Sequence, residues 1–125
     1  MKYQGHRIQF WKSNGDLLGA DDNMAVATYY GEFVSDNQPN VSCHLIYDGT
    51  VAFTATFESS NDRDATTYAA ATAGSWVDES SIADVVIAAA AGGNMMQHVG
   101  WSAARGRVKV VVTTGGRLVG WDSRR

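Results

Sequence analysis

Residues 50–58 run Thr50-Val-Ala-Phe-Thr-Ala-Thr-Phe-Glu58, and the bulky apolar side chains fall on every second position. Successive side chains of a β-strand point to opposite faces, so Val51, Phe53 and Phe57 share one face while the threonines and the glutamate share the other. This period of two indicates a strand with one face on the core. The segment therefore favours a fold built from half-buried strands.

A second strand, Val41–Tyr47, precedes this segment, and Asp48-Gly49 lies between the two. Asp-Gly is a frequent turn pair in tight hairpins because it tolerates positive φ angles. These residues therefore predict a hairpin over 41–58.

Residues 105–113 show the same alternation, and Thr114-Gly115-Gly116 separates them from a short strand over 117–121. We expect a second hairpin over 105–121. The alternation in the two hairpins places six side chains in the core: Val51, Phe53, Phe57, Val108, Val110 and Val112.

The composition agrees with an all-β protein. The 125 residues include 13 valines, 13 glycines and only 4 leucines, which favours pleated structure over helix bundles. Strands at intervals of about ten residues, with another over 24–34, predict a β-sandwich of jelly-roll type. Residues 81–91 suit either a short helix or a strand, because a serine cap and an alanine run compete with β-branched Val85–Ile87.

The length predicts a single domain. We assign residues 1–40 to an N-terminal arm with the first strands, acting as an anchoring segment, and residues 41–125 to the body of the sandwich.

Charge is distributed unevenly along the chain. The net charge is −3, yet residues 1–12 carry Lys2, Arg7 and Lys12 without any acid, and residues 105–125 carry six bases against Asp122. Twelve acids and one base lie between these ends. Either the ends neutralise the acidic body, or they bind an acidic partner surface. Nucleic acid is not expected, because a basic stripe interleaved with aromatic residues is missing.

Residues that could carry catalysis do not form a recognisable motif. Cys43 is the single cysteine and lies in an apolar strand, which is typical of a buried thiol. His6, His44 and His98 lack metal-ligand spacing, and no nucleophile motif or phosphate-binding loop is present. We therefore expect no enzyme, no cofactor and no metal, and the chain contains no apolar run of membrane-spanning length.

Tryptophan is frequent, with Trp11, Trp76, Trp101 and Trp121 in the chain. Each could lie in the core, at a protein interface or on a sugar-binding platform. Trp101 and Trp121 are the ones that we expect closest to a boundary.

The order of motifs resembles small β-sandwich proteins of tailed bacteriophage particles. It begins with the run from Val51 to Asp62, which contains Phe-Glu-Ser-Ser-Asn-Asp, and continues with Trp76 and Gln97-His-Val-Gly-Trp101. Arg105-Gly-Arg-Val-Lys-Val-Val-Val follows, before a glycine-rich turn. The resemblance covers about residues 45–121, and similar strings also occur in tail-associated and sugar-binding sandwich domains.

The resemblance implies a structural protein that decorates or cements a capsid, as a homotrimer, on the outer surface of the virion and in the host cytoplasm during assembly. The major capsid protein or another virion protein would be its partner, and no membrane is implied. The alternative is a carbohydrate-binding or tail-fibre accessory module that binds a glycan. The basic ends and their tryptophans are the expected partner-binding residues: Lys2, Arg7, Trp11, Lys12, Trp101, Arg117, Trp121, Arg124 and Arg125.

Overall fold

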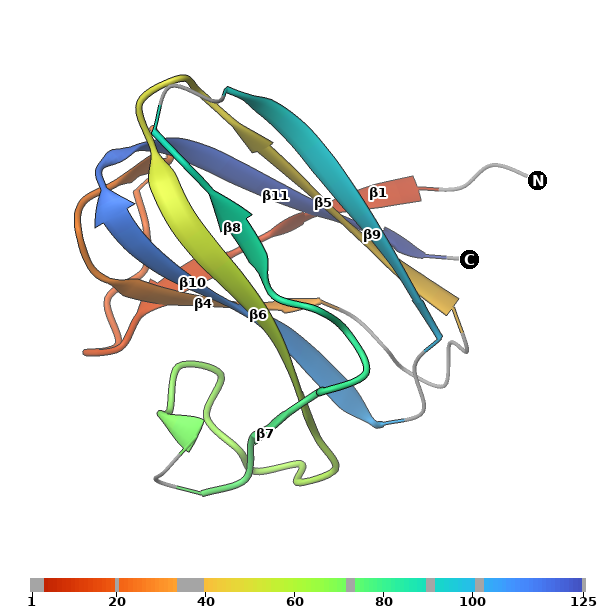
Figure 1. Cartoon of the computed structure of the whole chain (residues 1–125). Helices are drawn as coiled ribbons and strands as arrows, with labels where there is room; N and C mark the ends of the chain where they lie inside the picture. Colours follow the sequence, from red (N-terminus) through yellow and green to blue (C-terminus); the bar gives the residue numbers. More distant parts are fainter. Residues whose placement is uncertain are drawn as a thin grey trace.

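The computed structural model is an all-β sandwich of two antiparallel sheets (Figure 1). It describes residues 4–19, 21–33, 40–71, 74–89, 92–100 and 103–124. No α-helix is present within these ranges, so none of the described segments is a helix able to cross a membrane. The predicted fold class is thereby confirmed.

The first sheet contains the two ends of the described chain. Its strands lie in the order β1 (Gln4–Ile8), β11 (Gly116–Arg124), β5 (Asn40–Tyr47) and β9 (Gly93–Gly100). A short strand, β3 (Asn23–Met24), also pairs with β11. β1 and β11 lie side by side, which brings the two ends of the chain to the same side of the molecule (Figure 1).

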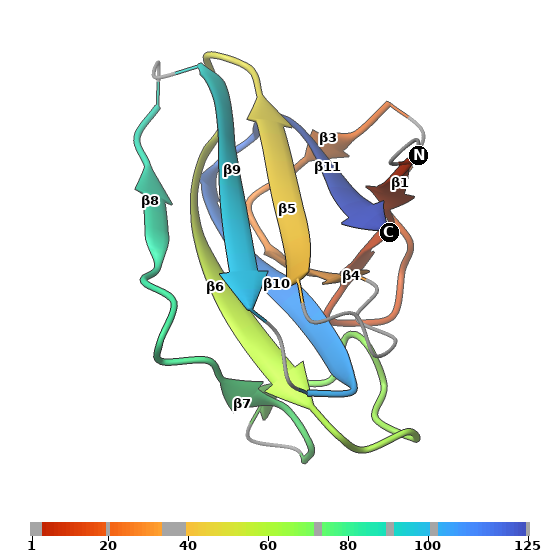
Figure 2. The same ribbon diagram turned by 90° about the vertical axis from the view of Figure 1, so that its right-hand side faces the viewer.

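The second sheet packs against the first. Its strands lie in the order β2 (Phe10–Lys12), β4 (Thr28–Phe33), β10 (Arg105–Thr114), β6 (Ala52–Ser60) and β7 (Val77–Asp78). β8 (Val85–Ile87) pairs with another part of β6. Figure 2 shows β8 at the same side of the sandwich as β9.

The core lies between the sheets and contains every side chain that alternation placed there. The six predicted core residues (Val51, Phe53, Phe57, Val108, Val110 and Val112) are at most 2 % exposed. Phe10 from β2 also belongs to this core, and its ring approaches two strand glycines, Gly31 and Gly120. A Cβ at Gly31 would lie 2.8 Å from the Phe10 ring, so the glycine makes room for the aromatic side chain.

Both predicted hairpins are wrong in their pairing, although their strands exist. β5 lies in the first sheet and β6 in the second, so the turn at Asp48 carries the chain between sheets. The Asp48 carboxylate shapes this turn by accepting hydrogen bonds from the backbone N–H groups of Thr50 and Val51 and, through its other oxygen, of Arg117. Gly49 does not adopt the positive φ of a tight hairpin turn. β10 and β11 are likewise in different sheets.

Residues 81–91, for which the sequence allowed a helix or a strand, contain a strand. Val85–Ile87 form β8, and residues 81–84, 88 and 89 are irregular, while residues 90 and 91 lie outside the described ranges. Residues 4–33 contribute strands to both sheets, so the described part of the N-terminal segment is integrated into the sandwich. Jelly-roll topology stays a prediction, which the repeated crossing of the chain between the two sheets favours.

Candidate interaction surface

Two of the predicted partner-binding residues meet at one carboxylate, and a third packs against one of them. Arg7 on β1 forms an ion pair with Asp22, and Arg117 Nη2 on β11 lies 3.6 Å from the same Asp22 oxygen. The Arg7 guanidinium also lies over Trp121, 5.7 Å from the ring centroid. Asp22 is buried with a φ of 58°, and its carbonyl accepts a hydrogen bond from Leu118 N at 3.2 Å. The chain thus holds this carboxylate firmly between two arginines.

The other predicted residues do not join this cluster. Trp11 and Lys12 lie on β2 in the second sheet, where the Trp11 ring packs against Tyr68 at a centroid distance of 5.8 Å. Arg124 ends β11. Lys2, Trp101 and Arg125 lie outside the described residues.

The outer face of the first sheet carries apolar side chains that stay partly exposed. Trp121, Ile46 and Met96 are 37 %, 40 % and 47 % exposed and lie on three neighbouring strands. Trp121 is opposite His44, and His44 is opposite Met96, so they form one row across the sheet. We call Trp121, Ile46, His44 and Met96 the outer row. Ile46 and Met96 were missed at the sequence level, although alternation against buried Leu45 already placed Ile46 on the outside.

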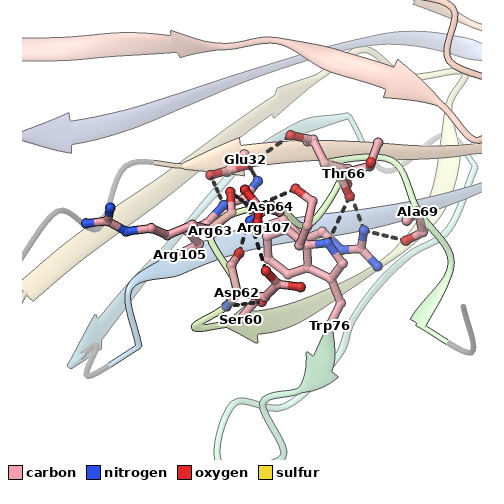
Figure 3. A network of polar contacts seen from close by, with 12 residues as sticks. Glu32, Ser60, Asp62, Arg63, Asp64, Thr66, Ala69, Trp76, Arg105 and Arg107 are labelled. Carbon is pink, nitrogen blue, oxygen red and sulfur yellow. Dashed lines mark hydrogen bonds and ion pairs between the residues drawn. The ribbon is translucent and has the colours of Figure 1, made fainter. Parts of the chain in front are cut away.

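The outer face of the second sheet is different, because parts of residues 61–71 and 74–78 pack over it around Arg107 (Figure 3). Arg107 points to this face and yet is 0 % exposed. Its Nε donates to Glu58 Oε1 at 2.9 Å, and its Nη1 donates to the carbonyl oxygens of Thr67 and Ala69 at 2.7 and 2.6 Å. The Trp76 ring centroid lies 4.4 Å from the Arg107 guanidinium carbon. Burial lowers the pKa of Arg107, and the contact with Glu58 opposes that shift.

Arg105 fixes the beginning of the same segment. Its Nε and Nη2 form a two-pronged pair with Glu32, at 2.9 and 2.6 Å. Its Nη1 donates to the carbonyl oxygens of Asp62 and Ala65 at 2.9 and 2.6 Å. The hydrogen bonds with Glu32 raise the pKa of Arg105. A hydrogen bond from Ser75 lowers the pKa of Asp62 and ties the two ends of the loop together.

These contacts explain much of the uneven charge distribution. Each ion pair just described joins an arginine of a basic end to a carboxylate of the acidic middle: Arg7 and Arg117 to Asp22, Arg105 to Glu32, and Arg107 to Glu58. Arg105 and Arg107 therefore neutralise carboxylates of the same chain. Arg7 and Arg117 share a single carboxylate and remain partly exposed, so they retain positive charge beside the outer row.

A histidine, an aspartate and a cysteine lie in one register across the first sheet, which the sequence analysis did not foresee. His6 is opposite Asp122, and Asp122 is opposite Cys43. His6 Nδ1 lies 3.7 Å from Asp122 Oδ1, whereas Cys43 is fully buried. Burial, together with the charge of Asp122, raises the pKa of the Cys43 thiol to about 12. Asp122 stands between the imidazole and the thiol, so this row does not provide an activated nucleophile.

Among the described residues, no cluster of three or more histidine, cysteine, aspartate or glutamate side chains could hold a metal ion. Comparison of the chain with family models, with curated proteins and with solved structures gave no match. The surface chemistry of the molecule therefore carries the functional argument.

Proposed function

We propose that this protein is a structural component of a bacteriophage particle, which decorates or cements the capsid through protein–protein contacts. The observation that supports this most directly is the outer row, in which three apolar side chains on one sheet face stay partly exposed beside His44. Apolar side chains that gather on an exposed face, with polar groups around them, mark interaction sites. The motif order described above supplies the phage context.

The chemistry around the outer row suits an acidic partner surface. Arg7 lies over Trp121 and shares the carboxylate of Asp22 with Arg117, so one positive charge is left uncompensated. A tryptophan and an arginine side by side are typical anchors of protein interfaces. The contact with the major capsid protein, or with another virion protein, would weaken as salt rises because exposed charges are screened.

The proposal includes no catalytic activity and no cofactor. Arg105 with Glu32 and Arg107 with Glu58 hold the backbone around Ala65 and Ala69 in place. The protein would lie on the outer surface of the virion, and in the host cytoplasm before assembly. The homotrimer implied by the resemblance stays a prediction.

Fractionation of phage particles from the source of this chain tests the proposal. An antibody to the chain should detect it in the density-gradient fractions that contain intact particles, and moderate salt should release it without dissolving the capsid. The Trp121→Ala variant should be recovered in the particle fraction several-fold less than Val77→Ala, which alters another exposed apolar residue, on β7. Absence of the chain from every particle fraction would contradict the proposal.

A carbohydrate-binding function is the second candidate, and the exposure of Trp121 favours it because sugar platforms use exposed aromatic rings. Trp76 is unsuitable as a platform, since it is buried under Arg107. Titration of the protein with bacterial surface polysaccharide, monitored by tryptophan fluorescence, separates the candidates. A saturable shift that Trp121→Ala abolishes would support sugar binding over the structural role.

A further inference from the structure

The margins of the two sheets are not equally protected against pairing with another strand. A free strand edge presents unpaired N–H and C=O groups, and proteins protect such edges with charge, proline, bulges or short length. Within the described ranges, β2, β7 and β8 are edges of two or three residues, and β1 carries Arg7. These edges are too short or too charged to pair readily.

β9 has none of these protections. It runs for eight residues, Gly93-Asn-Met-Met-Gln-His-Val-Gly100, without aspartate, glutamate, lysine, arginine or proline. Its register with β5 is unbroken from Gly100 opposite Asn40 to Gly93 opposite Tyr47, so no bulge bends it away. β5 is its only strand neighbour among the residues described. Figure 2 shows β9 at the margin of its sheet.

We propose that β9 pairs antiparallel with β9 of a second copy of this chain, about a two-fold axis normal to the sheet. The lack of lysine, arginine and carboxylate side chains in β9 permits this, because the two copies bring the same residues close together and like charges there would repel. The result is one continuous sheet across both copies, with β9 and its symmetry mate at the centre. The pairing does not depend on the virion role.

Symmetry restricts the register of this pairing. Residues directly opposite each other in paired strands must point to the same face of the sheet. Along β9, the two-fold axis must therefore lie level with a residue, and not level with the midpoint between two residues. Placing it at Met96 sets Met96 opposite its copy, and placing it at Gln97 sets Met96 opposite His98 of the partner subunit. In either register the exposed Met96 side chain meets the second copy, and the outer row continues into it.

A two-fold contact leads to an even number of chains. It is compatible with the predicted three-fold symmetry only in an assembly that contains both kinds of axis, and the smallest such closed assembly has about six chains. A particle of three chains in solution would therefore contradict pairing through β9, while leaving the structural proposal intact.

Lysine substitutions at two edges test the pairing. Met96→Lys should weaken self-association by roughly tenfold or more, because it places like charges near the axis of the paired strands. Val86→Lys is the matched control, since Val86 is 74 % exposed on the short edge strand β8. Sedimentation of the full chain at several concentrations gives the dissociation constants. Equal association by the two variants, or a wild-type chain that stays monomeric at the highest concentration, would overturn the inference.

Disulfide formation gives a second measurement, which does not require the lysine variant to fold. Under mild oxidation Met96→Cys or Gln97→Cys should give a dimer linked through β9, whereas Val86→Cys should stay monomeric. The native Cys43 is fully buried and should not contribute. Amide hydrogen exchange in residues 93–100 should also slow as protein concentration rises. Cross-linking that is no faster at positions 96 and 97 than at 86 would contradict the pairing.

Discussion

The guanidinium carbon of Arg107 lies 4.1 Å from the centre of the Tyr30 ring, and both residues are buried. Arg107 is on the outer face of β10, where alternation predicts an exposed residue. The centre of a Trp76 ring also lies close to the same carbon, at 4.4 Å. The arginine therefore contacts two aromatic rings while Glu58 neutralises it.

Removing this arginine should destabilise the protein strongly. Arg107→Met leaves Glu58 buried without its counter-ion. It also removes the hydrogen bonds that the carbonyl oxygens of Thr67 and Ala69 accept from Arg107. We expect a loss of about 3–5 kcal/mol in the free energy of unfolding. Lys109→Met, on the same face of β10, is the control and should change it by less than about 1 kcal/mol. Urea denaturation measures both variants.

Adding Glu58→Leu to Arg107→Met should recover part of this loss, because the uncompensated carboxylate is then also removed. If the double variant is less stable by the full sum of the two single effects, the buried pair is not coupled as the structure indicates.

Phe57 tests the packing between the sheets. Its side chain is fully buried and packs against Phe33 at a centroid distance of 6.3 Å. Phe57→Ala should cost about 3–5 kcal/mol, from lost burial and the cavity left behind. Thr56→Ala, on the opposite face of β6, should be close to neutral. A cost below about 1 kcal/mol for Phe57→Ala would mean that this face does not contact the core.

The turn at Asp48 should make stability sensitive to acid. Hydrogen bonds from Thr50 above all, and from Arg117, lower the pKa of Asp48 from 3.8 to about 2 in the folded protein. Because the pKa of Asp48 is lower in the folded than in the unfolded protein, its ionised carboxylate stabilises the folded state fully above about pH 4. This stabilisation is lost as the pH falls toward about 2. Asp48→Asn should therefore be less stable than the wild type at pH 6, and the difference should shrink between pH 4 and 2. Thermal unfolding across this range measures it, and a difference independent of pH would contradict it.

The Cys43 thiol should be unreactive in the folded protein. Burial raises its pKa to about 12, so the reactive thiolate is scarce at neutral pH and reagents cannot reach the sulfur. Alkylation by iodoacetamide should become at least about a hundredfold faster in denaturant, where the thiol has an ordinary pKa. Rapid labelling of the native protein at pH 7 would show that β5 opens readily.

Local patterns in the sequence predicted the strands and the core, but not their partners. The alternation at 51–57 and 108–112 depends only on neighbouring residues, and all six predicted core side chains are buried. Pairing depends on distant contacts. Asp48-Gly49 and Gly115-Gly116 do mark bends, yet each bend moves the chain to the other sheet, because β5 pairs with β11 and β6 pairs with β10.

The candidate site was only partly predictable for the same reason. Arg7, Arg117 and Trp121 were chosen for charge and residue type, and the structure brings the two arginines together at Asp22 and places Arg7 over Trp121. Trp11 and Lys12 were chosen on the same grounds but lie in the other sheet. The outer row depends on which strands neighbour one another, since Met96 joins His44 and Trp121 only through the pairing of β9, β5 and β11. The order of these strands in the sheet cannot be predicted from a local sequence pattern.

We propose that this chain functions as a component of a protein assembly. Sedimentation equilibrium of the full wild-type chain, at micromolar concentrations and moderate salt, tests this proposal most directly. We expect a mass equal to a multiple of the single chain, and the multiple should be even if β9 forms the contact. A mass of one chain at every concentration, together with a tryptophan fluorescence shift on adding polysaccharide, would contradict it.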